Sequence, residues 1–202
     1  MASSGLQLLG LFFALGGVAA TIAATVMVEW KKQAEGKAHS MHEGLWMSCG
    51  GAEKTACEIH ESLLKLPTEL QVTRAVILIS LFLSFLATVV SAVGMKCTRF
   101  LDGMADSKST IATVGGAMYI ISGLLTIIVT SWYVQMIVQS FHQSHHDSYE
   151  FGKAVFVSWT GGLLTMSGGA FLSCHRCWRS KASETINSNH LLHTSGAKSN
   201  YV

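Results

Sequence analysis

Cysteines are the side chains most able to do chemistry in this chain of 202 residues, which has five of them. Cys49 and Cys57 lie close together in a polar stretch, where an oxidising compartment favours a disulfide. Closing so short a loop contributes about 2.5 kcal/mol through chain entropy. Cys97, Cys174 and Cys177 each follow a long apolar run, a position that suits reversible palmitoylation, with inert reduced thiols as the alternative.

Two groups of side chains are of types that bind metals, but their number or spacing does not suit a metal site. Cys174, His175 and Cys177 are too few, because a structural zinc site needs four ligands and no second pair follows nearby. The second group lies in one short segment: His142, His145, His146 and Asp147. Adjacent histidines in such a segment seldom converge on one metal ion. We expect solvated imidazoles there, with at most a mild response to pH. The sequence therefore predicts no metal, no cofactor and no catalytic residue.

Long apolar runs are the elements that must position these residues. Half of the residues are hydrophobic and only 13% are charged, whereas a soluble domain carries nearer a quarter. Four runs lack Asp, Glu, Lys, Arg and His altogether: 6–28, 75–95, 111–133 and 154–173. Each is long enough to cross a hydrocarbon core of about 30 Å as a helix. A membrane span must be helical to satisfy its own backbone, so we predict four transmembrane helices.

The first run has one alternative interpretation, a cleaved signal peptide. Small residues that suit a cleavage site are present: Ala19, Ala20, Ala23 and Ala24. However, no charge precedes Glu29, and the apolar stretch is longer than a usual signal-peptide core. We expect the first helix to be retained.

Basic residues predict the orientation of the spans. The segment 96–110 contains Lys96, Arg99 and Lys108, and basic residues also outnumber the single acid Glu184 after Ser173. Positive segments stay in the cytoplasm, so we expect both termini inside and the segments 29–73 and 134–153 outside. The net charge of +2 and the lack of a basic cluster argue against nucleic-acid binding.

The outer segments contain weaker signals of local structure. Trp30 opens the first one, where an indole favours the membrane interface, and Gly36 suits a hairpin turn. Residues 38–47 alternate weakly, as a strand does. Apolar residues near helical spacing follow Cys57 and indicate a short helix that ends before Pro67: Ile59, Leu63, Leu64 and Leu66. In the fourth span, Gly161, Thr165 and Gly169 repeat every four residues, a spacing that suits close helix packing, with oligomerisation as a second possibility.

Several of these residues together resemble the first-loop signature of the claudin family. The matching residues are Trp30, Gly44, Leu45, Trp46, Cys49, Cys57 and Arg74. Residues 94–98, 149–152 and the terminal Tyr201 and Val202 are also similar to claudin motifs. The signature alone is shared with peripheral myelin protein and epithelial membrane protein relatives. This chain departs from the family in shorter intervals between Trp30 and Gly44 and between the two cysteines.

The resemblance implies a mainly α membrane protein at the tight junctions of the plasma membrane. Its fold is a left-handed bundle of four transmembrane helices over residues 1–178, with an extracellular antiparallel sheet. That sheet has four strands from the first loop and one from the second, and a disordered cytoplasmic tail covers 179–202. Such proteins polymerise with claudins in the same and neighbouring cells and seal the intercellular space or line charge-selective pores.

The resemblance also implies roles for particular residues. Glu58, supported by Glu53 and Glu61, lines a cation pore, with ordinary solvated surface as the alternative. Leu45 and Trp46 wedge the sheet against the bilayer or the helix tops, with a merely packed aromatic as the alternative. Arg74 pairs with a loop carboxylate or carbonyl or else anchors at the interface. Residues implied in assembly are Leu63, Phe141, His142 and Tyr149, with packing inside the molecule as the alternative for Leu63. The carboxylate and apolar side chain of a terminal Tyr201-Val202 bind PDZ scaffolds of the zonula occludens type.

Three classes of function are compatible with the sequence. The first is a junction protein that sets paracellular permeability, and the second is an adhesion or membrane-organising tetraspan of the myelin-protein type without a pore. A membrane enzyme or transporter is the third. It is disfavoured because no ionisable residue lies within any span, where a relay or substrate site needs one.

Overall fold

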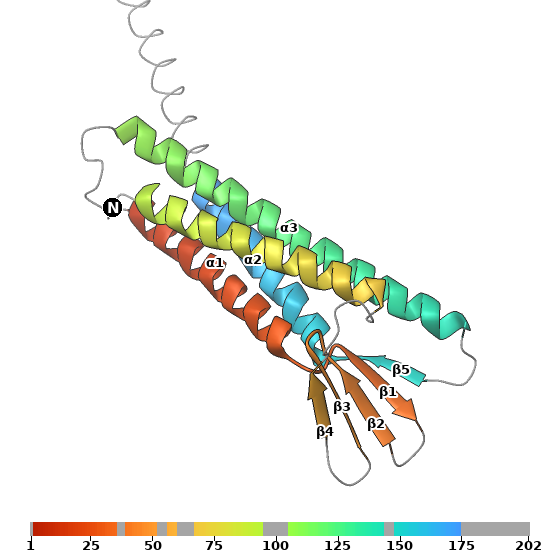
Figure 1. Cartoon of the computed structure of the whole chain (residues 1–202). Helices are drawn as coiled ribbons and strands as arrows, with labels where there is room; N and C mark the ends of the chain where they lie inside the picture. Colours follow the sequence, from red (N-terminus) through yellow and green to blue (C-terminus); the bar gives the residue numbers. More distant parts are fainter. Residues whose placement is uncertain are drawn as a thin grey trace, which may run out of the picture.

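The structure, a computed structural model, describes residues 2–35, 39–51, 56–59, 67–94, 105–143 and 148–174. The helices are α1 (Ala2–Val26), α2 (Thr68–Gly94), α3 (Ala105–Gln143) and a fourth helix at Lys153–Cys174. They run side by side, with a small sheet at one end and the N-terminus at the other (Figure 1). All four are long and apolar enough to cross a membrane, which confirms the predicted mainly α membrane fold.

The second and third helices extend beyond the predicted spans. α2 begins at Thr68 rather than Ala75, and the carbonyl of Pro67 accepts hydrogen bonds from the amides of Leu70 and Gln71. Proline suits this place because it lacks the amide that a first helical turn leaves unused. α3 continues to Gln143, so the third helix extends beyond the predicted end of its span near Tyr133. The apolar face persists there: Ile137, one turn after buried Tyr133, is only 7% exposed.

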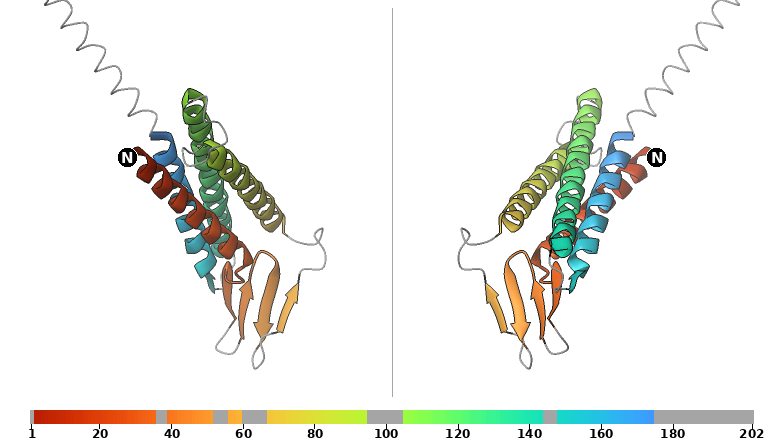
Figure 2. Two further views of the ribbon diagram at one scale, coloured as in Figure 1. Left: turned by 90° about the vertical axis from the view of Figure 1, so that its left-hand side faces the viewer. Right: turned by 90° about the vertical axis from the view of Figure 1, so that its right-hand side faces the viewer.

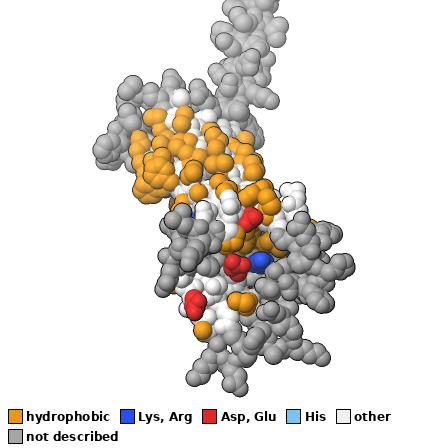
Figure 3. All heavy atoms as spheres, turned by 45° about the vertical axis from the view of Figure 1, so that its right-hand side comes forward, with side chains coloured by type: hydrophobic (Ala, Val, Ile, Leu, Met, Phe, Trp, Pro, Cys, Tyr) orange, Lys and Arg blue, Asp and Glu red, His pale blue; other side chains and the backbone are white. Residues whose placement is uncertain are grey.

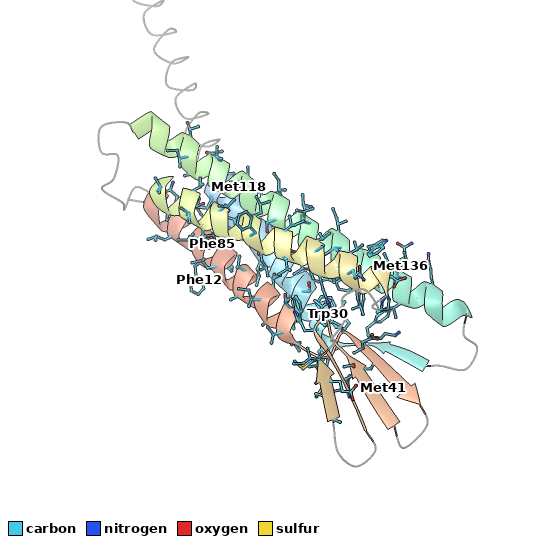
Figure 4. The ribbon with its side chains drawn as sticks, viewed as in Figure 1. Phe12, Trp30, Met41, Phe85, Met118 and Met136 are labelled. Carbon is cyan, nitrogen blue, oxygen red and sulfur yellow. A yellow bond between two sulfur atoms is a disulfide. The ribbon has the colours of Figure 1, made fainter. Side chains whose placement is uncertain are left out.

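Large apolar side chains cover the outside of the bundle. Phe12, Phe82 and Phe85 are 76%, 64% and 63% exposed. In Figure 3 apolar side chains dominate the surface of the helices, whereas the described charged side chains lie toward the sheet end. Figure 4 shows Phe12 and Phe85 on the helices, far from the sheet. An apolar surface of this extent requires lipid rather than water around it.

Hydroxyl groups join α2 to α3 inside the bundle. The Ser80 hydroxyl donates to the Ser122 carbonyl at 3.0 Å, and the Ser122 hydroxyl donates to the Ser80 carbonyl at 2.9 Å. Further bonds connect Ser80 with Thr126 at 2.7 Å and Thr88 with Tyr119 at 2.6 Å. Within a membrane the hydrophobic effect does not draw helices together, so hydrogen bonds and close packing hold α2 against α3.

Small residues let the fourth helix approach both α1 and α3. A Cβ at Gly17 of α1 would lie 2.5 Å from the Thr165 amide and 2.6 Å from the Gly161 carbonyl. On α3, a Cβ at Gly116 would lie 2.7 Å from the Gly169 carbonyl. The predicted packing role of Gly161, Thr165 and Gly169 is confirmed, with the first two against α1 and the third against α3. Figure 2 shows α1 beside the fourth helix and α2 beside α3.

The sheet has five antiparallel strands in the order β4-β3-β2-β1-β5. The strands are β1 (Lys31–Glu35), β2 (His39–Glu43), β3 (Met47–Gly51), β4 (Ala56–Ile59) and β5 (Ser148–Phe151). Four therefore come from the first outer segment and one from the second, as the resemblance implied. Gly36 lies between the paired strands β1 and β2 but outside the described residues.

Two local expectations change in the structure. The weak alternation over 38–47 belongs to two strands, because Gly44, Leu45 and Trp46 separate β2 from β3. The predicted helix after Cys57 is wrong at Ile59, which ends β4. Pairing with β3 overrides the helical spacing there. Leu63, Leu64 and Leu66 lie outside the described residues.

Adjacent glycines on α1 test the packing of this helix against the fourth. Gly17→Leu forces a side chain into Thr165 and Gly161, whereas a Cβ at the neighbouring Gly16 meets nothing within 4 Å. We expect Gly17→Leu to destabilise the purified protein by about 1–3 kcal/mol, the usual cost of overpacking. Thermal unfolding in detergent measures this, with Gly16→Leu as the matched control. Equal melting temperatures for the two variants would contradict the packing.

Candidate functional site

Trp30 is the centre of the junction between the helices and the sheet. It follows α1, is 0% exposed, and donates from Nε1 to the Ala24 carbonyl at 2.8 Å. That carbonyl belongs to the last turn of α1, where carbonyls have no partner within the helix. Its ring meets Tyr133 of α3 edge to face, with centroids 5.6 Å apart. Figure 4 shows Trp30 between the helices and the strands, and its burial means that the indole packs against protein there.

The backbone around Trp30 joins β2 and the start of the fourth helix. The Trp30 amide donates to the Glu43 carbonyl at the end of β2, at 3.1 Å. The Gly152 amide donates to the Trp30 carbonyl at 3.2 Å, and the Ala154 amide donates to the Glu29 carbonyl at 3.0 Å. A Cβ at Gly152 would collide with the Glu29 carbonyl, so only glycine fits where the fourth helix begins.

Gly44, Leu45 and Trp46 dock the end of the sheet on the bundle. The Gly44 amide donates to the Met47 carbonyl at 2.9 Å, and a Cβ at Gly44 would lie 2.7 Å from the Val28 Cα. Leu45 is 0% exposed in a cluster with Trp30, whereas Trp46 is 37% exposed. The remaining buried members of this cluster come from all four helices: Ala24, Leu70, Ile77, Val129, Tyr133, Ile137, Ala154 and Val155. Leu45 therefore packs into the bundle, as expected for the wedge.

Arg74 of α2 stacks on the Trp46 ring of this wedge. Its guanidinium carbon lies 5.0 Å from the centre of the Trp46 ring, within the range of a cation–π interaction. The side chain is only 6% exposed, so the expected snorkelling into water is wrong. Among the residues that the structure describes, Nε and Nη2 of Arg74 find no hydrogen-bond partner. The aromatic face of Trp46 therefore takes the place of an acceptor for this part of the charge.

A disulfide joins Cys49 of β3 to Cys57 of β4, as predicted. The two residues are directly opposite each other, with their Cα atoms 4.1 Å apart. β4 has only four residues, lies at one edge of the sheet, and is exposed along its length. β4 buries too little surface to be held firmly by packing, so the disulfide attaches it to β3.

One face of the sheet carries a row of polar residues at the same level on four strands. Lys31 is opposite Glu43, Glu43 is opposite Ser48, and Ser48 is opposite Glu58. Directly opposed residues point to the same face. Lys31 Nζ and Glu43 Oε2 are 3.9 Å apart, and Glu58 is exposed. We call Lys31, Glu43, Ser48 and Glu58 the charged row.

The structure places only some of the other predicted site residues. Phe141 and His142 lie in the last turn of α3, and Tyr149 of β5 is opposite Gln33 of β1. Cys174 is a free, exposed cysteine at the end of the fourth helix. The remaining predicted residues lie outside the described part of the chain: Glu53, Glu61, Leu63, Cys97, His145, His146, Asp147, Cys177, Tyr201 and Val202. Among the described residues, no three His, Cys, Asp or Glu side chains form a group that could hold a metal.

The charged row and the ring contact of Trp30 were not predicted. Lys31 and Glu43 are paired by the register of two strands, and Tyr133 meets Trp30 from a distant helix. No spacing in the sequence identifies such partners, because strand register depends on the whole sheet.

Known proteins resemble this chain over most of its length. Residues 4–172 match the model of the PMP-22/EMP/MP20/Claudin family. The chain is 42% identical to claudin-19 of Mus musculus over 184 residues, which cover 86% of this chain and 82% of the relative. It is 40% identical to claudin-1 of Rattus norvegicus and to claudin-7 of Mus musculus, with 86% of this chain and 87% of each relative covered.

A double-mutant cycle tests the stacking of Arg74 on Trp46. We expect Arg74→Ala and Trp46→Ala each to lower the melting temperature, and the double variant to cost less than their sum by about 1 kcal/mol. Trp46→Phe is the matched control because it retains an aromatic face. Additive effects of the two alanine variants in thermal unfolding would show that the contact contributes nothing.

Proposed function

The chain belongs to the PMP-22/EMP/MP20/claudin family as a multi-pass membrane claudin of tight junctions, and we propose that it forms strands that control paracellular permeability. The observation that carries the proposal is the sheet, which is held on the bundle by Trp30 and presents the charged row. Its disulfide suits the oxidising side of the membrane. We therefore propose an extracellular sheet and cytoplasmic termini, in agreement with the basic segment 96–110.

We propose further that Glu58 makes the permeation path selective for cations. Glu58 is exposed on the edge strand, and the neighbour directly opposite it is the uncharged Ser48. A carboxylate that faces a narrow path raises the local cation concentration and can replace water around a passing ion. Glu53 and Glu61 are proposed to strengthen this effect.

The proposed assembly involves copies of this chain and other claudins in the same and neighbouring cells. Its contact residues are proposed to be Leu63, Phe141, His142 and Tyr149, as the resemblance implies. Palmitoylation of Cys174 is supported by its exposure at the end of a membrane helix, and Cys97 and Cys177 share that expectation. Binding of Tyr201 and Val202 to zonula occludens scaffolds stays a prediction from the sequence. A protein that organises membranes without a pore is the second candidate, because the family model also covers that type.

Substitutions at Glu58 test the cation path in epithelial monolayers. Glu58→Gln is expected to lower the sodium-to-chloride permeability ratio about fivefold, the Coulomb effect of one charge about 4 Å from the ion in water. Glu58→Lys is expected to lower the ratio further or invert it. Ile59→Gln, at an exposed neighbour on the same edge strand, changes no charge and is the matched control. Dilution potentials measure the ratio, and freeze-fracture confirms the strands.

Two outcomes would contradict the proposal. Identical dilution potentials for wild type and both Glu58 variants, with strands intact, would make Glu58 ordinary solvated surface in a sealing claudin. Absence of strands in cells that express the wild-type chain at the surface would favour the non-pore candidate instead.

A further inference from the structure

The ion pair between Lys31 and Glu43 lies on the same face of the sheet as Glu58. Lys31 Nζ is 3.9 Å from Glu43 Oε2, and the two side chains are 23% and 33% exposed. They are directly opposite each other on β1 and β2, as Ser48 and Glu58 are on β3 and β4. The pair is therefore part of the surface that the proposed permeation path would meet.

The charged row is short enough for its charges to act on the same ion. Neighbouring strands are about 4.8 Å apart, so the backbones at Glu43 and Glu58 are about 10 Å apart and those at Lys31 and Glu58 about 14 Å. The Debye length at physiological ionic strength is about 8 Å, so the field of Glu43 reaches an ion at Glu58 only partly screened. Figure 3 shows acidic side chains spaced over the sheet end of the molecule, with a basic side chain against one of them.

The pair determines the net charge of the row. Lys31 cancels one of the two carboxylates, so the row as a whole has one net negative charge. Loss of Lys31 doubles that charge, and loss of Glu43 removes it. We propose that the Lys31–Glu43 pair is a second determinant of charge selectivity, in which Lys31 weakens the cation preference that Glu58 creates. This inference rests on the proposed permeation function.

The hydrogen bond that joins Glu43 to the junction comes from its backbone, because the Glu43 carbonyl accepts from the Trp30 amide. A partly exposed ion pair of this length contributes little to stability. Neutral variants of Lys31 and Glu43 are therefore expected to fold and form strands, so their effect on selectivity is separable from an effect on structure.

A second ion pair of the same length provides a matched control. Lys153 Nζ and Glu29 Oε2 are also 3.9 Å apart, but Lys153 begins the fourth helix and neither residue belongs to the charged row. Lys153→Met thus removes the same charge and breaks a similar pair at the same end of the molecule. It is expected to leave the permeability ratio unchanged.

The experiment compares dilution potentials of monolayers that express the variants, with strands counted by freeze-fracture. We expect Glu43→Gln to lower the sodium-to-chloride permeability ratio by up to about twofold, the unscreened effect in water of one charge about 10 Å away. Lys31→Met is expected to raise the ratio by a smaller factor, because Lys31 is about 14 Å away. The double variant is expected to bring the ratio back toward the wild-type value, because the net charge of the row is again one negative. If Lys31→Met forms no strands, Lys31→Gln replaces it.

The outcomes separate this inference from the proposed function. A ratio that responds to Glu58→Gln but not to Lys31→Met or Glu43→Gln would overturn the inference and leave the cation path standing. A shift of both single variants in the same direction, or an equal shift for Lys153→Met, would also overturn it. If Glu58→Gln has no effect either, the proposed cation path itself fails.

Discussion

The burial of one indole, Trp30, is the interaction on which the rest of the structure depends. Its Nε1 bonds the Ala24 carbonyl at the end of α1, and its backbone bonds the end of β2 and the start of the fourth helix. A buried indole removes roughly 150–250 Å² from solvent, more than any other side chain type can. With Tyr133 of α3, which meets the indole ring, elements from both halves of the chain therefore share one point. The sheet takes its position relative to the helices from that point.

The helices and the sheet are stabilised by different physical means. Between the helices, serine and threonine hydroxyls and small residues allow close contact, while large apolar side chains face outward to lipid. In the sheet, backbone pairing, the Cys49–Cys57 disulfide and a few charges hold strands that have little core of their own. The wedge of Leu45 and Trp46 joins the two parts. This division keeps the charged row in the sheet, outside the charge-free stretches of the helices.

Features that depend on single residues or on composition could be predicted, and features that depend on long-range pairing could not. Four charge-free runs predict four spans because the cost of a charge in lipid is decisive at each position. The disulfide followed from two neighbouring cysteines in one outer segment. The extension of α3 was missed because exposed Gln135 and Gln139 lower the hydropathy while Ile137 keeps a buried face. Ile59 and the Lys31–Glu43 pair were missed because strand register decides both.

Hydrogen–deuterium exchange of a Trp30→Phe variant tests most directly whether this residue anchors the sheet. The substitution removes the hydrogen bond to Ala24 but keeps an aromatic ring near Tyr133. We expect amide exchange to become faster in β1, β2 and β3 together, while the lipid-facing helices keep their protection. Trp159→Phe is the control, since it removes an indole hydrogen bond, from Trp159 Nε1 to Ser131, that joins two helices and does not involve the sheet. Unchanged exchange of the three strands in Trp30→Phe would contradict the account.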